Sequence, residues 1–163
     1  CCYYVTTTNL DVDSSGNVVT TGYVSSYANV VSITDATYTV ATTQSGAVFT
    51  LNRAAGIVVT LPTAAAGLQY TFIVGTTFTG AGQINTQNAS DLYSGFAQIF
   101  DEGAAGDTNT FIPGASNDDT IDLGSVEQGW LVGGIIRLKA TTAAVWHCEA
   151  FLSGDATLAT PFE

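Results

Sequence analysis

The chain has 163 residues, of which only 10% are charged, and its formal net charge is −11. Three Lys and Arg residues leave little to neutralise phosphate groups, so the composition disfavours nucleic-acid binding, and an anionic membrane surface would repel the chain. The length predicts one domain, and the shortage of charge relative to about 25% in average soluble domains favours a subunit that other chains cover.

The N-terminal segment, residues 1–35, is polar and rich in Thr and Ser, with its apolar residues spaced apart. Such a segment buries too little to fold alone. We predict an extended arm, or a short hairpin turning at 13–16, that lies on a neighbouring chain. The chain begins without a methionine or a basic apolar leader, so we expect no signal peptide. The predicted contact residues of the arm are Tyr3, Tyr4, Val18, Val19, Tyr23 and Tyr27.

Part of this segment resembles the start of a calcium-binding loop. Asp11, Asp13, Ser15 and Gly16 match its spacing, in which alternating oxygens surround a hard cation. The twelfth position, which needs a bidentate acid, is Gly22. A polar β-turn is therefore the favoured interpretation, and we expect no metal and no cofactor.

Alternation of β-branched or aromatic residues with small or polar ones predicts strands from residue 38 onward. The central three strands, 48–52, 57–61 and 70–74, each carry one apolar face, and Gly56, Pro62 and Gly67 mark the breaks between them. We interpret them as a meander in one sheet. The predicted fold is all-β: a β-sandwich or jelly-roll-like domain over 36–152, with the N-terminal arm before it and a tail, 153–163, after it. The other predicted strands are 38–42, 83–87, 96–100, 130–132, 135–140 and 144–152.

The segment 101–122 is the most acidic and least regular part of the chain. Its carboxylates could bind a cation or form a catalytic pair, which would need one pKa moved by burial or by a close like charge. Flanking Gly, Asn and Ser residues favour solvated loops instead. These acids are Asp101, Glu102, Asp107, Asp118, Asp119 and Asp122.

The last predicted strand has two distinct faces. Trp146 and Cys148 share one face with other apolar residues, which predicts a core thiol, whereas His147 and Glu149 share the other. His147 and Glu149 could begin a metal or acid–base site, but no third partner is evident. A polar pair at an interface or across strands is favoured.

Catalytic motifs are absent from the sequence. His147 is the sole histidine, no serine lies in a G-x-S-x-G motif, and the three cysteines Cys1, Cys2 and Cys148 have no zinc-ligand spacing. We therefore predict that the protein is not an enzyme. A glycosidase that uses carboxylates alone is the remaining catalytic hypothesis.

Two runs of the sequence resemble a known family. YTVATTQSGAVFTLNRAAGIVVTLPTAAAGLQYTFIVGT and the closing GGIIRLKATTAAVWHCEAFLSG resemble small β-sandwich head decoration (cement) proteins of tailed bacteriophages. The resemblance covers 37–154. It implies a structural protein on the outer capsid surface of the virion. Such a protein binds the major capsid protein, commonly as a homo-trimer, and ties neighbouring coat subunits together.

The alternative is a phage tail-fibre or receptor-binding module. The run LDVDSSGNVVTTGYV resembles fibre shaft sequence. Such a module would bind a carbohydrate or a surface protein through aromatic and acidic loop residues. Copy number per particle would separate the two, since a decoration protein is abundant and a fibre is not.

Overall fold

The structure is a computed structural model that describes residues 11–12, 18–19, 29–103, 107–114, 117–155 and 157–163. Near the N-terminus, β1 (Asp11–Val12) pairs antiparallel with β2 (Val18–Val19). This pairing agrees with the short hairpin that the sequence predicts there. The turn of that hairpin lies outside the described residues.

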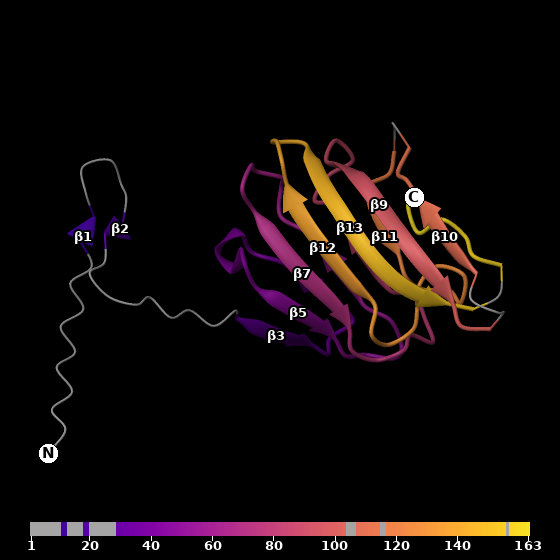
Figure 1. Ribbon diagram of the computed structural model, residues 1–163. Helices are drawn as coiled ribbons and strands as arrows, with labels where there is room; N and C mark the ends of the chain where they lie inside the picture. The colour runs from indigo at the N-terminus through magenta and orange to yellow at the C-terminus, as the bar shows by residue number, and fades with distance from the viewer. Residues whose placement is uncertain (1–10, 13–17, 20–28, 104–106, 115–116, 156) are drawn as a thin grey trace, which may run out of the picture.

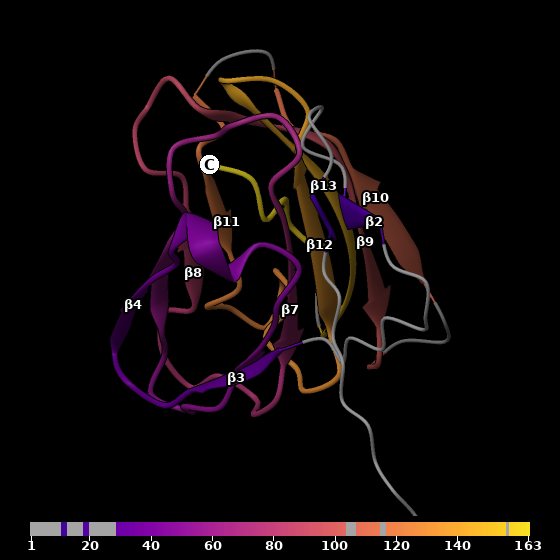
Figure 2. The same cartoon turned by 90° about the vertical axis from the view of Figure 1, so that its left-hand side faces the viewer.

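The described body is built from two sheets, which Figure 2 shows as separate layers. The larger sheet has seven strands in the order β10-β9-β13-β12-β7-β5-β3 (Figure 1). The smaller sheet has four strands in the order β11-β8-β6-β4. The larger sheet contains β3 (Val30–Ile33), β5 (Val48–Leu51), β7 (Gln69–Val74), β9 (Leu92–Asp101), β10 (Thr108–Phe111), β12 (Ile135–Ala140) and β13 (Val145–Gly154). The smaller contains β4 (Thr37–Thr39), β6 (Val58–Thr60), β8 (Gln83–Asn85) and β11 (Thr120–Asp122). The all-β prediction is confirmed, and the helix present in the described body is a short 3₁₀ turn, Thr42–Gln44.

The first six strands of the body wind as a parallel coil. The chain alternates between the sheets, so that β3, β5 and β7 are parallel neighbours in the large sheet. In the small sheet, β4, β6 and β8 are parallel neighbours in the same way. The register aligns buried side chains across the three strands, for example Ile33, Leu51 and Val74.

The predicted meander is therefore wrong. Alternation shows that a strand has one buried face, but it does not show to which sheet the strand belongs. The breaks at Gly56 and Pro62 carry the chain across to the facing sheet instead of reversing it into a hairpin. A jelly roll is built from antiparallel Greek keys. β5 and β6 instead pair with parallel neighbours on both sides, so this part of the fold does not have jelly-roll pairing.

The second half of the large sheet is mixed. β12 is antiparallel to both β7 and β13, and β13 runs parallel to β9 along all ten of its residues. The prediction 135–140 matches β12. The prediction 130–132 is wrong, because Gly129 and Gly133, both with positive φ, enclose a turn there.

The chain ends of the body differ from the predicted boundaries. β3 lies inside the predicted arm 1–35, yet its Ile33 is 1% exposed and belongs to the core. Near the C-terminus, Phe162 is buried and forms a β-bridge with Ile121. The predicted tail thus packs on the small sheet, because Phe162 supplies an apolar ring that is buried there.

The core lies between the two sheets. Phe49 stacks on Phe72 with ring centroids 5.1 Å apart, and Tyr70 packs on Trp146 at 5.7 Å. Both aromatic pairs come from the inner face of the large sheet, and side chains such as Ile84 of the small sheet lie in the same cluster. Burial of this continuous apolar layer is the main stabilising contribution to the fold.

Candidate binding surface

The outer face of the seven-stranded sheet is the main candidate surface. Side chains alternate along each strand, so every second residue points away from the core. The pairing registers align these residues into rows across the strands. One row is Phe96, Glu149, Arg137, Thr71, Val48 and Val30. The next row is Gln98, Phe151, Ile135, Ile73, Thr50 and Ser32.

The centre of this outer face is apolar. Phe96 and Phe151 meet edge to face with ring centroids 5.9 Å apart, beside Ile135 and Ile73. At the edge strand β3, Val30 is 63% exposed. A sheet whose other face covers the core normally presents polar residues to water, so this apolar centre indicates a contact surface.

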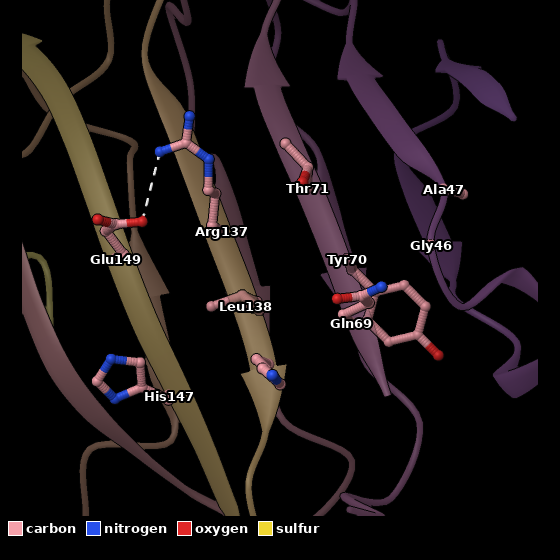
Figure 3. Close-up of a pocket in the computed structure, with 10 residues that line it drawn as sticks. Gly46, Ala47, Gln69, Tyr70, Thr71, Arg137, Leu138, His147 and Glu149 are labelled. Carbon is pink, nitrogen blue, oxygen red and sulfur yellow. Dashed lines mark hydrogen bonds and ion pairs between the residues drawn. The ribbon is translucent and has the colours of Figure 1, made fainter. Parts of the chain in front are cut away.

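A shallow hollow of about 390 Å³ lies on the same outer face, next to the row that contains Ile135 and Phe151. Figure 3 shows the residues that line it. Its charged side chains come from the neighbouring strands β12 and β13, where Nη1 of Arg137 lies 3.4 Å from Oε2 of Glu149. Lys139 on β12 lies opposite His147 on β13, two residues along each strand from the Arg137–Glu149 pair. The hollow is lined by Gly46, Ala47, Gln69, Tyr70, Thr71, Arg137, Leu138, Lys139, His147 and Glu149.

His147 and Glu149 lie on the outer side of β13, as predicted. Oγ of Ser94 lies 3.4 Å from Nδ1 of His147, and Glu149 pairs with Arg137. Neither contact supplies a third metal ligand. Within the described ranges, no group of three His, Cys, Asp or Glu side chains could hold a metal ion.

Several acidic residues of 101–122 stabilise turns. Oδ1 of Asp101 accepts a hydrogen bond from the Gly103 amide at 2.8 Å, and Oδ1 of Asp122 accepts one from the Gly124 amide at 2.7 Å. The prediction of loops throughout this segment is wrong, because β10 and β11 lie within it. Both are short Thr-containing strands that depend on pairing with β9 and β8, which the local sequence does not reveal.

The titratable groups of the interior are held neutral or are hydrogen-bonded. Burial raises the pKa of the Cys148 thiol to about 12, and the neighbouring Glu149 charge adds to this shift. The predicted core thiol is confirmed, and it is poorly reactive because little thiolate forms. Burial likewise raises the pKa of Tyr93, whose hydroxyl donates to the Ile84 carbonyl at 3.0 Å. Oδ2 of the buried Asp91 accepts from the Ala64 amide at 2.9 Å.

The predicted arm contacts cannot be placed on this surface. Tyr3, Tyr4, Tyr23 and Tyr27 lie outside the described residues, and Val18 and Val19 form β2 with side chains that are not described. Asp13, Ser15 and Gly16 of the calcium-loop pattern also lie outside the described residues, whereas Asp11 is the first residue of β1.

Sequence reasoning missed the outer face as a surface. The available signal was Phe151, which shares the polar side of its strand with His147 and Glu149, and Phe96, which aligns with Glu149 across the sheet. An apolar residue on the polar side of a strand is the pattern expected for a covered sheet.

Within the described ranges, no helix combines the length and the apolar character that crossing a bilayer requires. No family model matches the chain, and no curated protein and no solved structure is similar to it.

Proposed function

We propose that this protein is a capsid decoration (cement) protein of a tailed bacteriophage. In this proposal a β-sandwich body and an N-terminal arm bind the outer surface of an icosahedral head. The protein acts as a trimer and stabilises neighbouring subunits of the major capsid protein. Its role is structural, with no catalysis and no cofactor.

The observation that carries the proposal is the apolar outer face of the large sheet. Seven strands about 4.8 Å apart make this face about 29 Å wide. A face of this width is large enough to bury the ~800 Å² that each partner buries in a standard interface. Phe96, Phe151 and Ile135 form a central apolar cluster, with polar residues such as Gln98 and Thr71 around it. An apolar centre with a polar border is the usual composition of a specific interface.

Oligomerisation would strengthen weak single contacts. A trimer on a local threefold axis of the head presents three apolar centres at once. Linked contacts of this kind raise the overall affinity well above that of one site. The low charge of the chain, 10% of residues, fits a molecule that is largely covered by protein.

The test is binding to heads that lack the protein. The purified full-length chain should co-sediment with such heads and appear at many copies per particle in electron micrographs. Phe151→Asp should reduce binding at least tenfold, because it places a charge in the apolar centre. Thr39→Asp, on the exposed side of β4 in the other sheet, is the control and should bind normally. No binding by the unaltered chain, or equal losses in both variants, would reject the proposal.

The alternative, a tail-fibre or receptor-binding module, is favoured by the parallel coil β3–β8. Winding of successive strands between two parallel sheets also occurs in β-helices, which are elongated and repetitive. Particles would then carry few copies, located on the tail. Gold labelling of intact particles separates the two functions.

A further inference from the structure

The hollow on the outer face concentrates the positive charge of this acidic chain. The chain has three Lys and Arg residues against fourteen Asp and Glu, and Arg137 and Lys139 both line the hollow, as does the sole histidine. Glu149 pairs with Arg137, whereas Lys139 forms no salt bridge with any described residue. The hollow therefore carries one net positive charge before His147 is counted, and it suits a carboxylate.

The N-terminal segment joins the body close to this hollow. The amide of Val48 donates to the carbonyl of Asn29 at 2.8 Å, which fixes the point of entry. Ala47 and Gly46, the two residues before Val48, line the hollow. Val30, the first residue of β3, is largely exposed in the same row as Arg137. The N-terminal segment of each copy thus leaves the body at β3, close to the hollow of that same copy.

The composition of residues 1–28 complements the outer face. The segment contains Asp11 and Asp13 and no Lys, Arg or His. It also contains Tyr3, Tyr4, Tyr23 and Tyr27, four of the seven tyrosines of the chain. Carboxylates fit the cationic hollow, and tyrosine rings, which are apolar with one polar end, suit its mixed polar and apolar lining.

We propose that the cationic hollow of one copy receives residues 1–28 of a second copy, which leaves the apolar centre beside it free for the capsid. The segment adjoins its own body at β3, an edge strand of the large sheet. The ten residues between β2 and β3 could span on the order of 33 Å, enough to bring the β1–β2 hairpin to a neighbouring subunit. Each copy then donates one segment and accepts another, a head-to-tail contact that closes a ring. This inference rests on the oligomer of the proposed function and names its acceptor site.

Photo-crosslinking of the full-length chain tests this exchange. A benzoylphenylalanine is placed at Gln69, which is exposed and lines the hollow, and at Thr39 on the small sheet as the control. Equal amounts of ¹⁴N- and ¹⁵N-labelled protein are mixed, allowed to exchange and irradiated. We expect light–heavy crosslinks from position 69 into residues 1–28, and none from position 39. Crosslinks confined to single copies, crosslinks to other regions, or no crosslinks would overturn the proposal.

Charge reversal in the hollow gives a second readout. Lys139→Glu should raise the dissociation constant of the oligomer about tenfold, because it turns attraction for the segment into repulsion. Introducing Asp11→Lys and Asp13→Lys into the same chain should restore most of that loss. An unchanged dissociation constant in Lys139→Glu, or no recovery in the combined variant, contradicts the assignment of the hollow.

The two proposals fail in different ways. If residues 1–28 crosslink to the hollow but the protein never binds heads, the capsid function fails and the exchange stands. If the protein binds heads and the probe at Gln69 labels the coat protein instead, the exchange fails and the capsid function stands.

Discussion

The inner and outer faces of the large sheet use the same strands for different purposes. On β12 and β13 the inner residues, such as Leu138 and Trp146, are at most 1% exposed and entirely apolar. The outer residues next to them, such as Lys139 and His147, are exposed. The inner face holds the two sheets together, whereas the outer face mixes an apolar centre with charges. The difference indicates that outer apolar residues contribute little to the stability of this chain alone.

The largest expected effect comes from truncating the inner face. Trp146→Ala should lower the free energy of unfolding by about 3–5 kcal/mol, because it removes a fully buried ring and leaves a cavity. Phe151→Ala, on the outer side of the same strand, should cost under half as much. Urea unfolding followed by circular dichroism measures both variants. Equal losses would mean that the outer face is part of the monomer core.

The contact between β9 and β13 supplies a second test of the inner side. Gly95 has φ of 105°, and a Cβ at this position would overlap the carbonyl oxygen of Cys148. Gly95→Ala should therefore destabilise the fold by at least about 3 kcal/mol, from backbone strain and separation of the strands. Gly67→Ala is the control: φ is similar at 96°, but space is open there, so about 1 kcal/mol is expected. Similar values for the two glycines would show that β9 moves freely away from β13.

Local alternation was sufficient to find the strands that have a strong inner face. The segment 135–140 was predicted with the bounds of β12, and the two faces of β13 were assigned correctly around Trp146 and His147. These features depend on residues within one strand, so the sequence contains them. The fold class follows in the same way.

Pairing between distant strands was not predictable. The parallel neighbours β5 and β7 are separated by β6 in the other sheet, and nothing in their own residues marks the crossing. β10, with the sequence TNTF, is a strand because β9 offers it an edge. The hollow combines Gly46 and Gln69 with Arg137 and His147, which the register of four strands brings together.

Alkaline pH should lower the free energy of unfolding through groups on the inner face of the large sheet and not through groups on its outer face. Burial raises the pKa of Cys148 from its ordinary 9.0 to about 12 in the folded chain, so the folded state keeps the thiol proton to higher pH than the unfolded state. The contribution of this protonation to the free energy of unfolding is fully present below pH 9. It is lost as the pH rises from 9 to 12, and the free energy of unfolding falls by at most about 1.4 kcal/mol per pH unit. In Cys148→Ala this decline should become shallower. It should not vanish, because the pKa of Tyr93 is also raised by burial.

Thermal unfolding of both chains between pH 8 and 11 checks this expectation. Identical slopes for the unaltered chain and Cys148→Ala would show that the thiol ionises without unfolding the sheet. Outer-face variants such as His147→Ala serve as the control and should retain the original slope.

The smallest expected effect on stability is at the Arg137–Glu149 pair. The two side chains are 51% and 42% exposed, so Glu149→Gln should change the free energy of unfolding by less than about 0.5 kcal/mol. Its effect on association should have the opposite sign to that of Lys139→Glu, because removing Glu149 leaves both cations of the hollow free to attract a carboxylate. Sedimentation equilibrium at low salt should thus show slightly tighter association, and the gain should disappear at high salt. A looser oligomer would mean that Glu149 itself contacts the partner, and would contradict the binding of a carboxylate in the hollow.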